Sequence, residues 1–357
     1  MRELHVDQKT IADVAVAEAT PPALNDGEAR LRLQSCAVTA NNVTYAAAGF
    51  DLKYWAFFPT PAEGKGLVPV WGVAEVVESR SDVLRVGERL YGFLPLAEEL
   101  VMQPQAAGEK GVIDRAPHRA ELPGVYNHYA RVTGNDAKRD HQRALLQPLL
   151  ATSYVLKDWL QDNDFFEAEQ IIVGSASSKT GLGLCKFLSE GETRPKHIVG
   201  LTSARNKAFV EALGTCDQVL TYDAVDTLAQ VPSVYVDMSG NAQVKAALHA
   251  RLADVLRHSS AVGISHWDQF NPSVPLAGPK PEFFFAPSQI AKRQKEWGPG
   301  VMERKIGESW QSMVADAADW LEVTVHDGLA AAPEVWAAMA AGQADPRQGH
   351  IISFSAA

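Results

Sequence analysis

Residues 171–184 read IIVGSASSKTGLGL, in which a β-branched apolar run is followed by small residues and then by helical spacing. The run at 171–173 is too short for a helix and is typical of a strand buried on both faces of a parallel sheet. The small residues predict a tight turn, and the residues after Gly181 predict a helix. Such a turn lets backbone N–H groups and the positive end of the helix dipole approach a phosphate closely. The stretch therefore predicts a strand, a turn and a helix that together bind an anion.

The turn matches neither standard phosphate-binding motif. A dinucleotide fingerprint, G-x-G-x-x-G, that ends at Gly181 needs glycine at Ala176 and Ser178. A nucleoside-triphosphatase loop, G-x-x-x-x-G-K-[ST], would use Lys179 and fails at both of its glycine positions. Serine is small and its hydroxyl can donate to a phosphate, so a serine-rich dinucleotide turn is the favoured interpretation. A strand, turn and helix with a purely structural role is the alternative.

The length, net charge and cysteine content of the chain limit the class of protein and the kinds of partner. Its 357 residues are enough for two domains with a sizeable core. The net charge of −10 argues against nucleic acid or an anionic membrane as the main partner. The chain has no N-terminal signal pattern and no run of about 18 apolar residues, so we expect a cytoplasmic protein. Cys36, Cys185 and Cys216 are widely spaced, which argues against disulfides and a cysteine zinc site.

The chain changes character along its length. Residues 1–101 contain short strand patterns such as ARLRLQSCAV and VPVWGVAEVVES, separated by glycine-containing turns. Residues 143–160, RALLQPLLATSYVLKDWL, have helical periodicity despite Pro148. We therefore expect an all-β region first, a domain boundary near residues 129–140, and then a long helix that leads into the strand at 171.

Strands and helices alternate after residue 184. Strands are predicted at 197–201, 218–223, 233–240 and 259–265, with helices between them, one of which covers 242–257. A sixth strand at 282–287, helices at 288–298 and 307–323, and a final strand at 349–354 that returns to the N-terminal barrel complete the prediction. Successive strands joined by helices imply a doubly wound parallel sheet.

These features resemble the medium-chain dehydrogenase/reductase superfamily, in particular its zinc-free, quinone-oxidoreductase-like branch. The resemblance is carried by GEARLRLQSCAVTANNVTYAAAG at 27–49, VPVWGVAEVVES at 68–79, RVGERLYGF at 85–93, ATSY at 151–154 and VYVDMSGNAQ at 234–243. The chain is also similar to an uncharacterised bacterial family of reductase-like proteins with SASSKTGLG and FFFAP, which has no assigned reaction. The resemblance implies an α/β fold with a GroES-like β-barrel substrate domain at 1–130 and 318–357, and a Rossmann dinucleotide-binding domain at 131–317.

The resemblance also implies a set of cofactor contacts. The quinone-oxidoreductase-like branch often spaces its small turn residues as G-x-x-G-x-x-G, and Ser175, Ser178 and Gly181 take the three places here. Ser175 would then form the tight turn and Ser178 would lie near the pyrophosphate. We expect the cofactor to contact Thr152, Tyr154, Ser175, Ser177, Ser178, Lys179, Thr180, Gly181, Thr202, Ser203, Arg205, Lys207, Ser239, Gly240 and Gly263.

The end of the second strand of the sheet predicts the type of cofactor. An NAD-binding sheet usually has Asp or Glu there, which accepts hydrogen bonds from the ribose. Here Thr202 and Ser203 end the strand, Arg205 and Lys207 follow, and no acid is present. A hydroxyl, a guanidinium and an ammonium group suit a 2′-phosphate, so NADP(H) is favoured over NAD(H). The alternative is that both cations are solvated charges at a helix start.

Zinc ligands are missing at the positions where the zinc-dependent members of the superfamily carry them. By the resemblance, a cysteine ligand would fall at Thr39 and a His-Glu pair at Val73 and Ala74, and none of these side chains binds zinc. We therefore expect no metal. No tyrosine is followed four positions later by lysine, which disfavours a short-chain reductase.

Catalytic candidates come from the segment that resembles the substrate loop. Asn42 and Tyr45 lie there, and either is expected to hydrogen-bond a substrate oxygen, with Tyr45 as a proton donor. Packing of Tyr45 in the core is the alternative. His266, just past the fifth strand, is a further candidate for the cleft, with a surface or packing role as its alternative.

The stretch FFFAPSQIAKRQKEW at 283–297 is a second candidate for the cleft. Its three consecutive phenylalanines cannot all face one side of a core, and Gln289, Lys292 and Arg293 would meet an acidic or oxygenated substrate. The alternative is a buried strand followed by a solvated helix face.

Together these features predict an NADPH-dependent oxidoreductase that reduces a small carbonyl, enone or quinone-like compound by hydride transfer without zinc. The alternative is a sensor or inactive protein that keeps the fold and binds the dinucleotide, because the turn lacks two glycines and no proton donor is unambiguous. The two missing glycines of the G-x-x-x-x-G-K-[ST] motif disfavour a nucleoside triphosphatase. We expect a small-molecule substrate, neither nucleic acid nor membrane as partner, and, from the resemblance, a homodimer.

Overall fold

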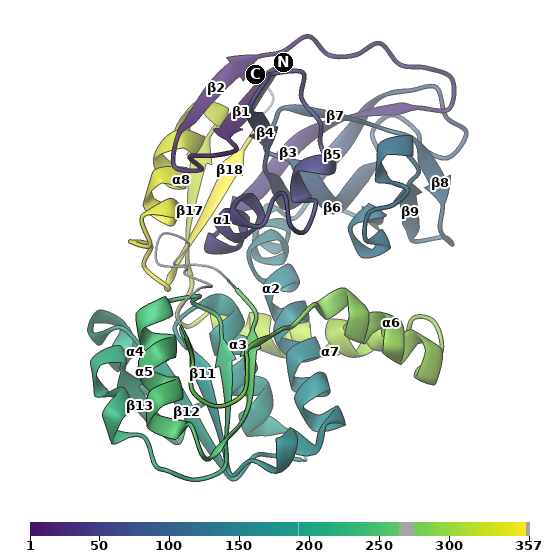
Figure 1. Ribbon diagram of the computed structural model, residues 1–357. Coiled ribbons are helices and arrows are strands. Elements are labelled where there is room, and N and C mark those ends of the chain that lie inside the picture. Colours follow the sequence, from purple (N-terminus) through teal and green to yellow (C-terminus); the bar gives the residue numbers. More distant parts are fainter. Residues whose placement is uncertain (192, 264–274, 355–357) are drawn as a thin grey trace. The chain divides into compact units, whose positions relative to one another are not determined.

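The computed structural model describes residues 1–191, 193–263 and 275–354 (Figure 1). Contacts between residues divide the chain into two compact units, Met1–Leu145 with Leu321–Ala357 and Leu146–Trp320. The first division lies inside the long helix α2, Ala137–Asp162, whereas the sequence placed the domain limit at residue 131. Pro148 lies within α2, so the helix predicted across this proline is confirmed.

The first unit consists mainly of antiparallel strands, which confirms the predicted β-rich N-terminal region. Its larger sheet has the order β17-β18-β3-β5-β6-β10-β9-β8 with β7 paired to β3, and its smaller sheet has the order β2-β1-β4. The strands are β1 Arg2–Asp7, β2 Val14–Glu18, β3 Ala29–Val38, β4 Lys65–Leu67, β5 Pro69–Ser79, β6 Arg89–Pro95, β7 Glu99–Met102, β8 Pro104–Ala106, β9 Gly111–Asp114, β10 His128–Val132, β17 Glu322–Asp327 and β18 Gln348–Ser353. The helices are α1 Ala40–Ala47 and α8 Ala332–Ala340, and the 3-10 turns are η1 Tyr54–Ala56, η2 Pro117–Arg119, η3 Gly124–Asn127 and η8 Leu329–Ala331.

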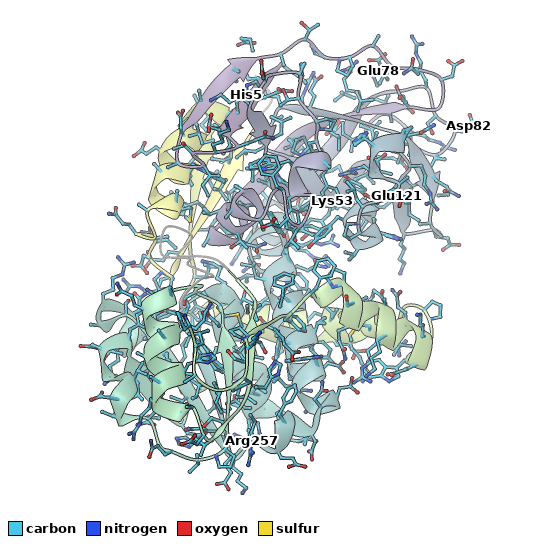
Figure 2. The ribbon with its side chains drawn as sticks, in the orientation of Figure 1. His5, Lys53, Glu78, Asp82, Glu121 and Arg257 are labelled. Atoms are coloured by element: carbon cyan, nitrogen blue, oxygen red, sulfur yellow. The ribbon has the colours of Figure 1, made fainter. Side chains whose placement is uncertain are left out.

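The alternating pattern of β3 explains its place in the core of this unit. Leu31 and Leu33 are fully buried, whereas Arg32 between them is exposed. The Nε atom of Arg30 is 3.2 Å from Oε2 of Glu78, which lies near the end of β5 (Figure 2). The hydrophobic alternation therefore sets which face of β3 packs inward.

The last strand returns to the N-terminal sheet, as predicted. β18 pairs antiparallel with β3, with Ile352 opposite Cys36. The predicted end of the preceding helix at residue 323 is wrong, because β17 begins at Glu322 and pairs in parallel with β18. The β-branched residues Val323 and Val325 favour a strand once a partner is available. Helix α8 was not predicted from the sequence.

The second unit contains a six-stranded parallel sheet. Its strand order is β13-β12-β11-β14-β15-β16, which is 3-2-1-4-5-6 in chain order and confirms the doubly wound prediction. The strands are β11 Gln170–Gly174, β12 His197–Thr202, β13 Gln218–Thr221, β14 Ser233–Asp237, β15 Leu256–Ala261 and β16 Glu282–Phe283. The helices are α3 Lys179–Glu190, α4 Lys207–Ala212, α5 Ala242–Leu252, α6 Ala286–Trp297 and α7 Val301–Ala317, and the 3-10 turns are η4 Asp164–Glu167, η5 Ala204–Asn206 and η6 Tyr222–Thr227.

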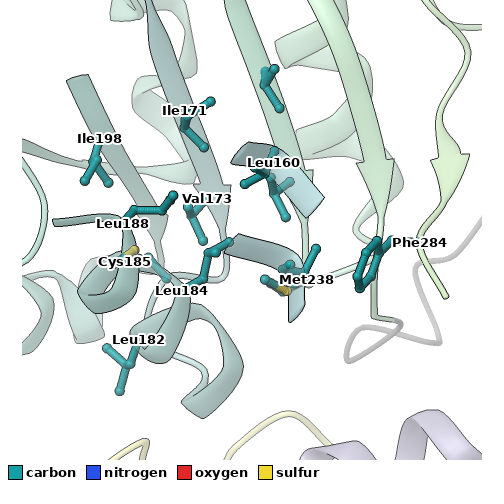
Figure 3. Close-up of a cluster of buried hydrophobic side chains, with 14 of the residues drawn as sticks. Leu160, Ile171, Val173, Leu182, Leu184, Cys185, Leu188, Ile198, Met238 and Phe284 are labelled. Carbon is teal, nitrogen blue, oxygen red and sulfur yellow. The ribbon is translucent and has the colours of Figure 1, made fainter. Parts of the chain in front are cut away.

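Strand β11 is buried on both faces, as its apolar run indicates. Ile171 and Val173 belong to a cluster that includes Leu184 of α3 (Figure 3). Ile172 lies in a second cluster with Leu248 of α5. The sheet is therefore covered on both sides, and β11 brings its following turn to the edge where the carboxyl ends of the strands meet.

Several predicted boundaries in this unit are wrong. The strand predicted through residue 240 ends at Asp237, and the helix predicted from residue 307 begins at Val301. The helix predicted through residue 257 ends at Leu252, and β15 begins at Leu256 instead of residue 259. β15 pairs with β14, and Leu256 lies opposite Ser233. Residues 256–257 fit the helical pattern equally well, but pairing with β14 makes them part of a strand. The predicted sixth strand is present only as the two residues of β16.

A left-handed turn joins α2 to β11. Asp164, Phe165, Phe166 and Glu167 have φ values of 48°, 50°, 55° and 56°. Left-handed backbone costs about 1–2 kcal/mol for each residue other than glycine. Phe165 is buried, and the ring of Phe166 stacks on His258 of β15 with centroids 4.2 Å apart. Aromatic packing therefore holds this turn in place.

Candidate functional site

The turn after β11 adopts the geometry of a small-residue turn at a helix start. Ser175 has φ of 53°, a left-handed conformation that normally favours glycine. Ser178 is the N-cap of α3: its Oγ accepts a hydrogen bond from Gly181 N at 3.1 Å and donates to Ser175 O at 2.8 Å. The structure thus places Ser175 at the tight turn, as the G-x-x-G-x-x-G spacing predicted, and Ser178 at the N-cap of α3.

Gly181 stands where no side chain fits. A Cβ atom on this residue would lie 2.5 Å from Ser175 O and 3.0 Å from the Cα of Ala176. Both contacts are with backbone, so they cannot be relieved by a side-chain movement. Gly181 therefore allows α3 to pack closely against the turn.

Polar groups tie this turn to the end of the neighbouring strand. Ser177 Oγ accepts hydrogen bonds from Thr202 Oγ1 at 3.0 Å and from Asn206 Nδ2 at 3.1 Å. Ser177 and Thr202 are buried. The hydroxyls of Ser177 and Thr202, both predicted cofactor contacts, are thus used within the protein, and Asn206 was not predicted because its partner is 29 residues away in the chain.

The first residues of α3 place their backbone N–H groups at the turn. Lys179 and Thr180 are the first two helical residues, and the earliest N–H groups of a helix have no intrahelical acceptor. The Gly181 N–H is capped by Ser178. The N-terminal end of α3 therefore combines backbone donors with the positive end of its dipole.

The residues after β12 form a short basic turn. Ser203 is the N-cap of η5, and its Oγ is buried without a hydrogen-bond partner among the described residues. Arg205 is exposed. Lys207 Nζ is 3.7 Å from Glu211 Oε1, a surface pair that contributes little to stability. An orphaned hydroxyl beside two surface cations is the donor set that suits a phosphate monoester.

Tyr222, which begins η6, also reaches the turn. Burial raises the pKa of Tyr222, and a hydrogen bond with Ser175 opposes that shift. The sequence gave no signal for this contact, because the tyrosine lies after the third strand of the sheet and meets the turn only in the folded unit.

The turn after β14 is arranged around Asp237. The Oδ1 atom of this buried carboxylate accepts hydrogen bonds from Ser239 N at 2.9 Å, Ser239 Oγ at 2.9 Å and Gly240 N at 3.0 Å. Lys245 Nζ lies 3.2 Å from Oδ2. Gly263 N is 3.3 Å from Asp237 O. Ser239, Gly240 and Gly263, all predicted cofactor contacts, are thus brought together by one acidic residue that the prediction did not include.

The two predicted contacts on α2 differ in their surroundings. Thr152 Oγ1 donates to Pro148 O at 3.1 Å along its own helix. Tyr154 is half-buried against Phe187, and burial raises its pKa. Ser153, which was not predicted, donates from Oγ to Thr180 O at 2.7 Å. Ser153 therefore holds the first turn of α3, whereas Thr152 bonds to its own helix.

Asn42, in the first unit, has both ends of its amide engaged. Its Oδ1 accepts from Thr39 N at 2.6 Å in a capping box of α1, and its Nδ2 donates to Pro69 O at 2.8 Å. Asn42 is buried. The amide therefore fixes the start of α1 against the strand β5.

Tyr45 lies in an aromatic cluster of the first unit. Trp71 Nε1 donates to Tyr45 Oη at 3.2 Å, and the ring centroids of Tyr54 and Phe93 are 4.5 Å and 5.4 Å away. Tyr45 is 5% exposed, and burial raises its pKa. Its hydroxyl is therefore neutral at ordinary pH and keeps its proton for donation.

The stretch at 283–297 is used for packing in the second unit. Phe284 is buried and Phe283 is 52% exposed. Arg293 Nε lies 2.7 Å from Asp158 Oδ2, and Gln289 Nε2 lies 2.8 Å from the same oxygen. Gln289 and Arg293 are buried, so the solvated face that the alternative interpretation assumed for the cations is wrong for Arg293. Lys292 pairs with an aspartate of α2 as well. His266 lies outside the described residues.

Within residues 1–191, 193–263 and 275–354, no group of three or more His, Cys, Asp or Glu side chains is placed to hold a metal ion. None of the helices in these ranges is long and apolar enough to cross a bilayer.

A family model described as "Protein of unknown function (DUF2855)" matches residues 36–345. The chain belongs to the DUF2855 family. A comparison with curated protein sequences finds no significant match. The family resemblance predicted from SASSKTGLG and FFFAP agrees with this assignment.

Solved structures resemble this DUF2855 protein over its whole length. CurA from Vibrio vulnificus in complex with NADPH has 13% identity and a TM-score of 0.64, with 100% of both chains covered. The yhdH oxidoreductase from Salmonella enterica in complex with NADP has 13% identity and a TM-score of 0.55, with 99% and 100% covered. A quinone oxidoreductase from Pseudomonas syringae pv. Tomato DC3000 has 12% identity and a TM-score of 0.56, with 98% and 99% covered. At these identities the likeness shows that the DUF2855 protein has the fold of the quinone-oxidoreductase-like reductases.

Proposed function

We propose that this protein is an NADPH-dependent oxidoreductase that reduces a small carbonyl, enone or quinone-like compound without zinc, as a homodimer in the cytoplasm. The observation that carries the proposal is the turn after β11, where Ser175 has left-handed backbone, Ser178 caps α3 and Gly181 permits close packing. Two structures with the same fold, CurA and the yhdH oxidoreductase, were solved with NADPH and NADP.

The residues of the second unit fit a dinucleotide in two places. The N-terminal end of α3 offers backbone donors for a pyrophosphate. The orphaned Ser203 hydroxyl, with Arg205 and Lys207, offers donors for a 2′-phosphate. β12 ends without an acid that would repel that phosphate. These features favour NADP(H) over NAD(H).

Bound NADPH would supply the hydride. The chain contributes preorganisation, because Asp237, Ser153 and Ser177 hold the turns around α3 and α5 before any ligand arrives. Tyr45 is the candidate proton donor of the first unit, since its oxygen accepts from Trp71 and its raised pKa keeps the hydroxyl protonated.

A sensor or binding protein of the same fold is the second candidate function. The surroundings of the two catalytic candidates favour it. Both ends of the Asn42 amide are engaged in structural hydrogen bonds, and other aromatic rings largely cover Tyr45. This candidate predicts nucleotide binding without turnover.

The first test is a fluorescence titration of the purified protein with NADPH and NADH. We expect NADPH to bind more tightly, and the Arg205→Ala/Lys207→Ala double variant to lose that preference. Lys196→Ala is a matched control, because Lys196 lies just before β12, at the opposite end of that strand, in a surface pair with Glu169. Absence of binding by either nucleotide would refute the proposal. Oxidation of NADPH with a panel of quinones, enones and aldehydes would then separate the reductase from the binding protein.

A further inference from the structure

Strand β17, Glu322–Asp327, forms one edge of the larger sheet of the first unit. It pairs in parallel with β18 on one side, and none of the described strands pairs with its outer side (Figure 1). Among the edge strands of the described residues, β17 is the longest, with six residues. The opposite edge of the same sheet, β8, has three residues and begins with Pro104, which cannot donate a ladder hydrogen bond. β17 has no proline, lysine or bulge, the features that usually block pairing at an edge.

The backbone groups of β17 alternate between its two sides. Glu322 N donates to Arg347 O at 2.8 Å, and Gly328 N donates to Ser353 O at 2.8 Å. Even-numbered residues of β17 therefore direct their N–H and C=O groups toward β18, because successive residues of a strand alternate in direction. The odd-numbered residues, which include both valines of the strand, direct theirs to the outer side. The outer edge of β17 thus presents donors and acceptors to another strand.

The side chains of β17 are open to solvent. Val323 is 38% exposed and Val325 is 50% exposed, and the two lie on the same face of the strand. Glu322, Thr324 and His326 lie on the other face, where the first two are exposed and the histidine is half-buried. An edge strand with two exposed β-branched apolar side chains has surface that pairing with a further strand would cover.

The sequence of β17 is self-complementary in one antiparallel register. In this register Thr324 of one copy faces Thr324 of a second copy across a twofold axis. Val323 then lies opposite Val325, in a pair whose outward N–H and C=O groups bond to each other. Val–Val and Thr–Thr contacts are both favourable cross-strand pairs. Backbone groups and side chains therefore match in the same register.

The charges of β17 favour this register. Glu322 lies opposite His326 at both ends of the pair, and an imidazole N–H donates readily to a carboxylate. The Nε2 atom of His326 lies 3.0 Å from His350 Nδ1 of β18, so its Nδ1 atom is the one left for the glutamate. A register shifted by two residues places Val323 opposite the Asp327 carboxylate instead. Charge complementarity thus points to a second copy of the same strand as the partner.

We propose that β17 pairs antiparallel with β17 of a second copy of this chain, so that the two larger sheets join across a twofold axis. The interface is isologous, because one strand supplies both of its surfaces. This interface rests on the homodimer of the proposed function and specifies which surface forms it. It needs no nucleotide, so dimer formation and NADPH binding are measured separately.

The first test is sedimentation velocity of the full-length protein over a range of concentrations, without nucleotide. We expect a dimer, and Val325→Pro should raise its dissociation constant about tenfold or more. Proline removes an outward N–H that β18 does not use, so the fold should be retained, which circular dichroism checks. Val325→Thr is the matched control, because it keeps both the N–H and the β-branched shape, and it should weaken the dimer less. A monomer at every concentration, or an unchanged dimer in folded Val325→Pro, would overturn the proposal.

Disulfide cross-linking locates the strand without the proline variant. Directly opposed residues of an antiparallel pair are close enough for a disulfide, whereas diagonal neighbours lie about 7–8 Å apart and are not. Mild oxidation of Thr324→Cys should therefore give a covalent dimer linked through residue 324. Val325→Cys, whose own copies are diagonal neighbours, should not cross-link through residue 325. Peptide mapping separates these links from any made by the native cysteines. No link at 324, or equal linking in both variants, would overturn the proposal.

A charge exchange tests the register. Glu322→Lys should weaken the dimer, because it removes the carboxylate opposite His326, and Glu322→Lys/His326→Glu should restore it by reversing the pair. A dimer that is no stronger in the double variant would contradict the proposed register. NADPH titration of the same variants should give unchanged affinity. A monomer that binds NADPH would therefore overturn the interface alone, and a β17-linked dimer that binds no nucleotide would overturn the reductase alone.

Discussion

The two ends of β11 both carry left-handed residues that are not glycine, yet they are held in different ways. At the amino end, Asp164–Glu167 forms a left-handed turn fixed by aromatic packing. At the carboxyl end, a single residue, Ser175, has φ of 53° and is surrounded by hydroxyl and backbone hydrogen bonds. Strain of this kind persists only where the surroundings determine it.

The difference separates a structural turn from a candidate binding turn. At the amino end, Phe166 stacks on His258 and contacts Trp159, and apolar burial offsets the strain. At the carboxyl end, only Ser175 has left-handed backbone, and polar groups lie at the start of α3. We therefore expect changes at the amino end to alter stability alone and changes at the carboxyl end to alter nucleotide affinity.

The largest effect is expected at the amino end. Phe165→Ala removes a buried ring and should lower the free energy of unfolding by about 3–5 kcal/mol. Urea unfolding followed by circular dichroism measures this loss. Phe283→Ala is the matched control, because Phe283 is 52% exposed and should lose less than about 1 kcal/mol. A loss of similar size in both variants would show that aromatic burial does not hold the turn.

Gly181→Ala tests close packing at the carboxyl end. The added Cβ would lie 2.5 Å from Ser175 O, so we expect a stability loss of about 1–3 kcal/mol and NADPH binding weaker by about tenfold or more. Gly307→Ala is the control, because a Cβ atom there would meet nothing within 4 Å. Gly307 lies in α7, where alanine has a higher helix propensity than glycine, so this variant should not lose stability. Unchanged NADPH affinity in Gly181→Ala would contradict the proposed role of the turn.

Glycine substitutions that relieve the left-handed backbone strain compare the two ends of β11 directly. Glu167→Gly and Ser175→Gly should each stabilise the protein by up to about 1 kcal/mol, because glycine adopts positive φ without steric cost. Isothermal titration should show a changed NADPH affinity only for Ser175→Gly. An equal change in Glu167→Gly would remove the distinction between the ends.

The smallest effect is a pH dependence at the amino end. Burial lowers the pKa of His258, which faces Phe166 and Trp159 and lies near the Glu282 carboxylate. Because the folded protein holds this histidine neutral, its stabilising contribution is present above the unfolded pKa of about 6.5 and is lost as pH falls through the folded pKa. The free energy of unfolding should therefore drop between pH 7 and pH 5, and by less in His258→Phe. An identical drop in both proteins would exclude His258 as a source.

The sequence predicted the parallel sheet because β-branched runs separated by helical patterns leave few other arrangements. It also predicted the turn after β11, since Gly181 and the serines around it are defined locally. It did not predict the left-handed turn at Asp164–Glu167, whose stability comes from His258, a partner far along the chain.

The site was harder to predict than the fold. Ser153 and Asn206 contact the predicted turns, but each does so through a partner that only folding brings near. Asp237 organises the turn after β14 through Ser239 and Gly240, which directly follow it in the chain. The first two residues of β17 were predicted as the end of a helix, because the strand character of this segment depends on pairing with β18. Local patterns therefore located the turn, and tertiary hydrogen bonds decided which side chains remain available.

The most direct test of the central claim is amide hydrogen exchange of the protein with and without saturating NADPH. We expect slower exchange in peptides that cover residues 174–181 and 202–207, and no change at residues 164–167. Slower exchange at both ends of β11, or at neither, would contradict the account.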